Sequence, residues 1–161
     1  ILRGMRALVL SDLHLEFQTL TLTHGGRRID DGADVVILAG DIGVGCDGLG
    51  WARKAFPGKE IVYVAGNHVF YGSNYEYRLD DLRGVGYRDG VHFLERDRVT
   101  ISGITFLGAT LWTDFMLFDQ LEFSMEEAYY GLAVSVASRP LLPGRGEQVS
   151  MRPYARQWTY P

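Results

Sequence analysis

Residues 7–14 have the sequence ALVLSDLH, in which four apolar residues run directly into a polar segment that contains Asp12 and His14. Two later stretches repeat this plan, VVILAGD at residues 35–41 and IVYVAGNH at residues 61–68. The apolar runs are continuous and rich in β-branched residues, as is typical of parallel strands covered on both faces. The segments between them have about the length of a βαβ crossover. The pattern therefore predicts an α/β fold.

The segments between and after these strands predict helices and further strands. Residues 51–56 form a short helix candidate that Pro57 and Gly58 stop. The glycine-rich stretch at residues 40–50 is interpreted as a flexible loop, and a capping box at residues 73–76 opens a second helix. Further strands are predicted at residues 91–94, 99–101 and 104–107, the last two joined by a tight turn at Ser102 and Gly103.

The C-terminal part of the chain changes character. A capping box at residues 124–127 opens a predicted helix that extends to residue 136. Beyond about residue 138, prolines and glycines interrupt the hydrophobic periodicity that would indicate a helix or a strand. Residues 138–161 also hold four arginines and one glutamate. The predicted organisation is one domain over residues 1–137 followed by an irregular basic tail at residues 138–161.

Composition limits the classes of function. The 161 residues carry a formal charge of −4, so nothing general points to nucleic acid or an anionic membrane as a partner. Cys46 is the only cysteine, which excludes an intrachain disulfide and a C-x-x-C zinc or redox site, and fits a reducing, cytoplasmic location. The first apolar run, residues 7–10, is too short for a signal peptide or a membrane span.

Residues with carboxylate, amide or imidazole side chains follow each of the three predicted strands. In parallel α/β sheets, ligands gather where the carboxyl ends of neighbouring strands meet. Asp12 and His14 follow the first predicted strand, Asp41 follows the second, and Asn67 and His68 follow the third. Carboxylate, amide and imidazole are the ligands that a hard-to-borderline divalent metal prefers. Asp41 lies centrally among them, placed to bridge two ions.

The three blocks D-x-H at residues 12–14, G-D at residues 40–41 and G-N-H at residues 66–68 resemble the calcineurin-like metallophosphoesterases. Residues 108–115, which contain TLWTDF, are similar to a segment found in a bacterial subset of that family. The resemblance covers roughly residues 5–132. It implies an α/β/β/α sandwich with a dimetal site at one edge.

The resemblance also implies a role for each matching residue. Asp12, His14 and Asp41 would hold a first divalent ion (Mn, Fe, Zn or similar), and Asp41 and Asn67 a second. His68 would lie beside the substrate phosphate, where it stabilises the transition state or protonates the leaving oxygen. The implied reaction is hydrolysis of a phosphomonoester or phosphodiester by a metal-activated water.

The sequence departs from the family pattern in one respect. The family completes its site with later histidines, including a G-H-x-H motif, whereas this sequence contains only His14, His24, His68 and His92. His24 is interpreted as a surface residue and His92 as a strand residue with a polar contact. The second metal site is therefore expected to be weak, and the second sheet largely missing. A truncated product, a frame-shifted product and a deliberate fragment all remain explanations for such an ending.

Three alternatives to an active phosphoesterase remain open. One is a non-catalytic remnant that binds at most one metal, or that needs an oligomer or a complementing chain to cover the missing sheet. Another is a nucleic-acid binder that uses Arg139, Arg145, Arg152 and Arg156, which the acidic body of the chain disfavours. The last is a nucleotide-binding fold without catalysis. The sequence contains no G-x-G-x-x-G or P-loop motif, which argues against this alternative.

Overall fold

The computed structural model describes residues 4–112 of the chain. The chain divides into two units, residues 1–111 and residues 112–161, and the features below belong to the first. The helix predicted to end at residue 136 and the tail predicted at residues 138–161 lie outside the described residues.

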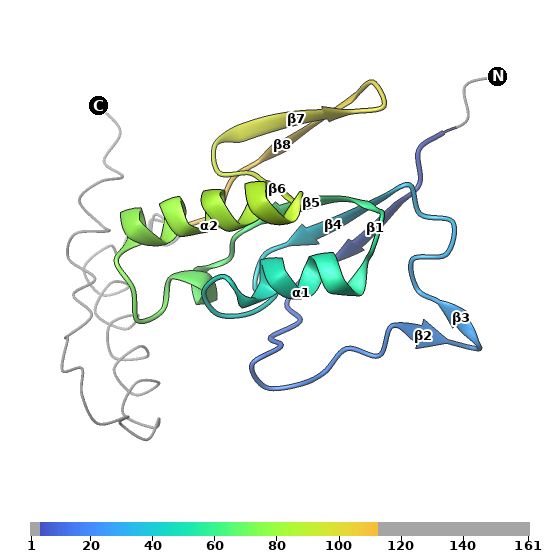
Figure 1. The fold of residues 1–161 in the computed structure, drawn as a ribbon, viewed down its shortest axis with the longest axis horizontal. Helices are drawn as coiled ribbons and strands as arrows, with labels where there is room; N and C mark the ends of the chain where they lie inside the picture. Colours follow the sequence, from blue (N-terminus) through green and yellow to red (C-terminus); the bar gives the residue numbers. More distant parts are fainter. Residues whose placement is uncertain (1–3, 113–161) are drawn as a thin grey trace, which may run out of the picture. The chain divides into compact units, whose positions relative to one another are not determined.

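A four-stranded parallel sheet forms the centre of the first unit (Figure 1). Its strands lie in the order β1-β4-β5-β6, and their bounds are Ala7–Leu10, Val35–Ala39, Glu60–Val64 and His92–Phe93. All three pairings are parallel. The three strands predicted from the apolar runs are therefore confirmed, and each lies beside the next one along the chain.

Burial differs between the strands of this sheet. β4 is buried over three of its first four residues, and β5 over its middle three. β1 alternates between exposed and half-buried residues, and the side chain of Val9 is 58% exposed. The prediction that every strand is covered on both faces is thus wrong for β1 in the described part of the chain. The elements that cover the sheet contact mainly β5 and β6 and lie away from β1, which is an edge strand there with β4 as its single neighbour.

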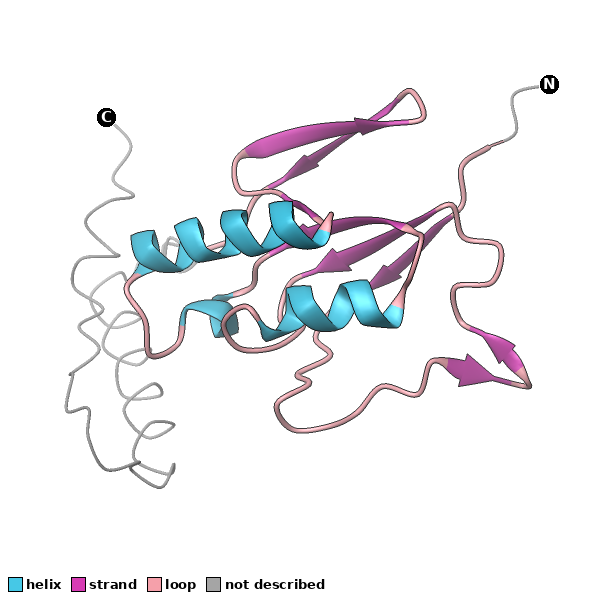
Figure 2. Cartoon of the chain, in the orientation of Figure 1, coloured by secondary structure: helices cyan, strands magenta, loops and turns pink. Residues whose placement is uncertain are grey.

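Two helices, α1 (Asp47–Ala55) and α2 (Tyr75–Asp89), pack together on one face of the sheet (Figures 1 and 2). α1 begins well before residue 51, so the interpretation of residues 40–50 as a loop is wrong for the last four of them. Close packing accounts for a glycine inside this helix, because a Cβ at Gly48 would lie 2.5 Å from the Tyr63 hydroxyl of β5. Tertiary packing here overrides the low helix propensity of glycine.

The N-terminus of α2 is capped one residue later than the capping box predicts. The side chain of Asn74, and not that of Ser73, accepts hydrogen bonds from the backbone N–H groups of Glu76 and Tyr77, at 2.9 and 3.2 Å. Asparagine is among the preferred N-cap residues because its short side chain reaches these otherwise unpaired donors. The predicted helix is confirmed, and it ends at Asp89, where the left-handed backbone of Gly90 caps it.

Arg53 ties the carboxyl ends of both helices together. Its guanidinium donates hydrogen bonds to the carbonyl oxygens of Asp89 and Gly90 at the end of α2. It also donates to those of Phe56 and Lys59, just after α1. The planar fork of arginine can serve several acceptors at once, and the last carbonyls of a helix need donors from outside it.

A two-stranded antiparallel sheet, β7 (Asp97–Ile101) and β8 (Ile104–Gly108), covers part of the other face. Ile101 packs in one hydrophobic cluster with Val35 of β4 and Val62 of β5. The turn residues Ser102 and Gly103 both have positive φ, 48° and 81°, as a two-residue hairpin turn of type I′ requires. The first unit therefore has helix, sheet and sheet layers, and the predicted hairpin is confirmed.

The two histidines outside the predicted site lie as expected. His24 is exposed in a small hairpin formed by β2 (Thr23–His24) and β3 (Arg27–Arg28). His92 lies in β6, and its Nε2 lies 2.9 Å from Oε2 of Glu60. Within residues 4–112, none of the helices is long and apolar enough to cross a membrane.

Candidate metal centre

The loops that follow β1 and β4 run side by side beyond the ends of their strands. The backbone N–H of Asp12 donates to the carbonyl oxygen of Gly40 over 3.1 Å, and that of His14 to the carbonyl oxygen of Asp41 over 3.0 Å. These bonds continue the parallel pairing past Leu10, where β1 ends. The two loops are therefore fixed to one another before any side chain is considered.

Three of the predicted ligands converge where these loops meet. Asp12, His14 and Asp41 each offer a ligand atom, and the three atoms all lie within 4.8 Å of one another. Asp12 is exposed, and His14 and Asp41 are half-buried. Two carboxylates and one imidazole form a donor set that fits a divalent ion such as Mn²⁺, Fe²⁺ or Zn²⁺. The residues that the sequence assigned to the first metal are thus brought together.

The backbone at these three ligands is in the left-handed region. Among residues 4–112, five non-glycine residues have positive φ, and three of them are Asp12 at 53°, His14 at 44° and Asp41 at 50°. Aspartate and histidine enter this region more readily than most residues, but it still costs free energy. Strained backbone of this kind clusters at functional sites, where the surrounding structure holds it in place.

Asp41 also contacts the loop that follows β5. Its Oδ1 accepts a hydrogen bond from the backbone N–H of His68 over 3.0 Å. A Cβ on Gly66 would collide with the same carboxylate and would lie 2.5 Å from the backbone nitrogen of Asp41. The Asp41 side chain therefore lies against the third loop, in the central position that a bridging ligand needs.

Asn67 lies between two residues that contact Asp41, namely Gly66 and His68. It is the first residue of the short 3-10 helix η1 (Asn67–Phe70), and the hydroxyl of Tyr71, just after this helix, orients its side chain. Its Nδ2 donates to the hydroxyl of Tyr71 over 2.6 Å, so its Oδ1 is the atom left to contact an ion.

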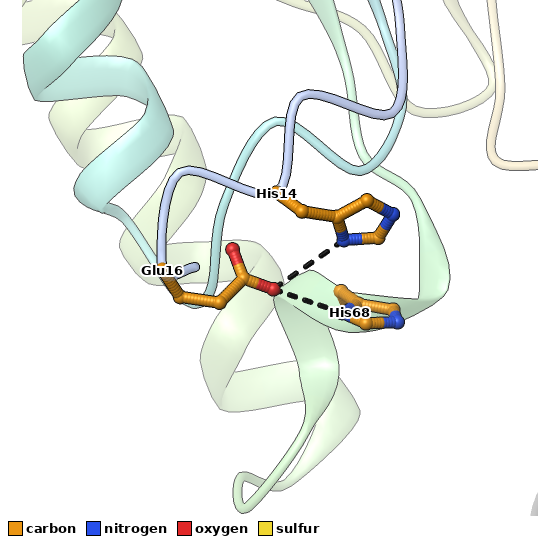
Figure 3. Close-up of side chains that lie close together, drawn as sticks. All are labelled: His14, Glu16 and His68. Atoms are coloured by element: carbon orange, nitrogen blue, oxygen red, sulfur yellow. Dashed lines mark hydrogen bonds and ion pairs between the residues drawn. The ribbon is translucent and has the colours of Figure 1, made fainter. Parts of the chain in front are cut away.

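His68 and His14 share a carboxylate that the sequence analysis did not single out. Oε1 of Glu16 lies 3.0 Å from Nδ1 of His68 and 3.4 Å from Nδ1 of His14 (Figure 3). The two imidazole rings are 4.4 Å apart between centroids, at an edge-to-face angle of 65°. The only signal in the sequence was that Glu16 stands two residues after His14.

The charge of Glu16 is set by two opposing effects. Burial raises the pKa of its carboxyl, but hydrogen bonds from its own backbone N–H and from the imidazoles of His68 and His14 lower that pKa by more. The net pKa lies below the ordinary value for glutamate, so Glu16 is ionised at neutral pH. An ionised carboxylate is purely an acceptor, and each of its oxygens can accept two hydrogen bonds.

Comparisons with known proteins concern the family and the fold of the chain. A family model described as calcineurin-like phosphoesterase matches residues 5–119. Among solved structures, the chain is similar to phosphopantetheinyl hydrolase (PptH) from Mycobacterium tuberculosis, with 16% identity and a TM-score of 0.58 over 94% of this chain. That similarity covers 59% of the hydrolase, so the chain spans less than two thirds of its length, and at this identity the likeness concerns the fold alone. No curated protein matches the sequence.

Proposed function

The chain belongs to the calcineurin-like phosphoesterase family, and on this premise we propose that it is a divalent-metal-dependent phosphoesterase that hydrolyses phosphomonoesters or phosphodiesters. Family membership confirms the resemblance drawn from residues 12–14, 40–41 and 66–68, and the α/β fold that it implied. The observation that carries the proposal is the convergence of ligand atoms from Asp12, His14 and Asp41 within 4.8 Å.

The proposed metal ligands divide between two ions. Asp12, His14 and Asp41 would hold the first, and Asp41 and Asn67 would hold the second. Bound divalent ions would neutralise the phosphoryl oxygens and lower the pKa of the attacking water. The role of Asp41 is supported by its position between the β1 loop and the β5 loop, each of which it contacts.

His68 is proposed to be the catalytic residue. Hydrolysis joins a water oxygen to phosphorus and breaks the ester P–O bond, whose electron pair stays on the leaving oxygen. Nε2 of His68 donates the proton that this oxygen takes up, and the proton lost by the water returns to solvent, which reprotonates the imidazole. In support of this role, Nδ1 of His68 contacts Glu16, so Nε2 is the nitrogen left for the substrate.

A second candidate function is a one-metal module without turnover. It is favoured by the ligands proposed above, of which Asp12, His14 and Asp41 would serve one ion, whereas Asn67 would add only a single amide oxygen for another. A site held by one carboxylate and one amide would bind its ion weakly.

Metal analysis together with turnover separates the two candidates. The purified protein is loaded with Mn²⁺ or Zn²⁺, desalted, and assayed for bound metal and for hydrolysis of p-nitrophenyl phosphate and bis(p-nitrophenyl) phosphate. The proposed function predicts two ions per chain and hydrolysis of at least one ester. One ion without hydrolysis supports the second candidate.

A pair of variants tests the ligand assignment. Asp41→Ala is expected to remove both the bound metal and the hydrolysis, because it deletes the shared ligand. Asp47→Ala is the matched control, since Asp47 is an exposed residue at the start of α1. Unchanged metal content in Asp41→Ala would refute the site.

A further inference from the structure

One carboxylate oxygen reaches both imidazoles of the proposed site. Oε1 of Glu16 lies 3.0 Å from Nδ1 of His68 and 3.4 Å from Nδ1 of His14. The side chains of Glu16, His68 and His14 are 17%, 21% and 27% exposed, so each keeps some access to water while it contacts the others. A carboxylate has no proton to donate when ionised, so both contacts require Nδ1–H on the imidazole side.

The orientation of the rings gives these contacts a consequence. Figure 3 shows that the second nitrogen of each ring, Nε2, lies on the side away from Glu16. An imidazole that carries its proton on Nδ1 presents a lone pair at Nε2, which is the form that binds a metal ion. The same carboxylate therefore leaves Nε2 of His14 and Nε2 of His68 available together.

The local backbone explains how Glu16 reaches both rings. The N–H of Phe17 donates to the carbonyl oxygen of His14 over 2.8 Å, and Nε2 of Gln18 donates to the carbonyl oxygen of Leu13 over 3.0 Å. These bonds close a turn directly after His14. The turn brings Glu16 beside the imidazoles of His14 and of His68, which is 52 residues further along the chain.

We propose that Glu16 is a positioning residue that holds His14 and His68 in the Nδ1–H tautomer by accepting a hydrogen bond from each. The inference rests on the proposed function, in which His14 would hold the first ion through Nε2 and Nε2 of His68 would face the leaving oxygen. For His68 the bond to Glu16 is the same with and without a proton on Nε2, so the ring keeps its orientation while that proton is given and regained. Glu16 thus couples the metal ligand to the catalytic residue.

The primary test reads the tautomers directly and needs neither metal nor activity. Long-range ¹H–¹⁵N correlation spectra of ¹⁵N-histidine-labelled, metal-free protein are recorded at about pH 8.5, where ordinary imidazoles are neutral. The signals of His14 and His68 are expected to show protonated Nδ1 and unprotonated Nε2. In Glu16→Ala both signals should move toward the Nε2–H tautomer, whereas Glu16→Gln, whose amide oxygen still accepts, should largely retain Nδ1–H.

The chain offers a matched control for this experiment. Glu60 and His92 form another glutamate–histidine contact, with Oε2 and Nε2 2.9 Å apart. Glu60→Ala should therefore change the signal of His92 and leave those of His14 and His68 unchanged. An Nε2–H tautomer at His14 or His68 in the wild type, or spectra of Glu16→Ala that match the wild type, would overturn the inference whatever the fate of the proposed function.

Steady-state kinetics provide a second test of the positioning role of Glu16. In metal-loaded protein, Glu16→Ala should lower kcat roughly 10–100-fold with a smaller change in KM, as is usual for the loss of a group that orients metal ligands. Glu16→Gln should restore most of that loss. If instead Glu16→Gln removes the bound metal as completely as Asp41→Ala, Glu16 is a direct ligand, and the positioning role is refuted while the phosphoesterase proposal stands.

Discussion

The backbone N–H of His68 donates a hydrogen bond to Oδ1 of Asp41 over 3.0 Å. This bond joins the loop after β5 to the loop after β4, and the backbone of the Asp41 loop is in turn bonded to the loop after β1. The proposed bridging ligand is therefore also the residue that links all three loops. Its carboxylate is oriented by the protein itself, which lowers the entropic cost of gathering ligands around an ion.

Gly66→Ala should disrupt this link. The new Cβ would lie 2.5 Å from the backbone nitrogen of Asp41 and against its carboxylate, and a backbone atom cannot move aside cheaply. We expect a loss of stability of about 1–3 kcal/mol in urea unfolding of the metal-free protein, together with weaker metal binding.

The control for Gly66→Ala is Gly84→Ala. Gly84 lies inside α2, where a Cβ would meet nothing within 4 Å, so this change should stabilise the helix by about 0.5–1 kcal/mol. If Gly66→Ala were as stable as the wild type and bound metal equally well, the close approach of Gly66 to Asp41 would have no structural importance.

Tyr71→Phe should weaken the proposed contact of Asn67 with a metal ion. The Tyr71 hydroxyl accepts from Nδ2 of Asn67 over 2.6 Å, and its removal frees the amide to rotate. Loss of a group that orients a ligand typically lowers metal affinity about 10–100-fold, which isothermal titration calorimetry with Mn²⁺ can measure. Tyr77→Phe, at a residue that is 75% exposed, should leave the affinity unchanged. Equal affinity in the two variants would argue against an oriented Asn67.

Arg53→Lys should lower stability although it preserves the charge. The guanidinium of Arg53 donates to four carbonyl oxygens near the ends of α1 and α2, and a lysine ammonium cannot reproduce that fork. Hydrogen bonds to a charged group contribute about 1.5–3 kcal/mol, so we expect a loss of about 2 kcal/mol in chemical denaturation. The exposed neighbour Lys54, replaced by alanine, should change stability by less than about 0.5 kcal/mol. Equal effects of the two changes would contradict the proposed tie.

The thiol of Cys46 should react slowly in the folded protein. Burial raises its pKa, and this outweighs the opposite effect of the Arg78 guanidinium. Because the thiolate is the reactive form and a higher pKa means less thiolate at a given pH, native protein at about pH 8 should react with Ellman's reagent more slowly than protein unfolded in urea. Asp47→Asn should speed the native reaction slightly, since the Asp47 charge contributes to the raised pKa. A native rate equal to the unfolded rate would show that the thiol is freely accessible.

The strands and the convergence of three candidate ligands could be predicted from sequence because each depends on local pattern. Asp12, His14 and Asp41 follow apolar runs directly, and parallel strands bring their carboxyl ends to one edge. The start of α1 could not be predicted in this way. Glycines at positions 48 and 50 oppose a helix by propensity, and the packing of Gly48 against Tyr63 becomes visible only in three dimensions.

Glu16 was missed for a related reason. Its partnership with His68 spans 52 residues and depends on the turn after His14, neither of which leaves a periodic signal. A single glutamate near a histidine is common in any sequence. Its importance here comes from the loop geometry that places it beside two imidazoles.

The left-handed backbone at Asp12, His14 and Asp41 also limits how this site can evolve. β-Branched and bulky side chains are strained in that conformation, whereas glycine adopts it readily and asparagine, aspartate and histidine adopt it more easily than most residues. Of these, all but glycine carry an atom that can bind a cation. Descendants of this chain would therefore change their ion preference by exchanging carboxylate, carboxamide and imidazole on an unchanged main chain, and would accept β-branched residues there only after rebuilding the loops.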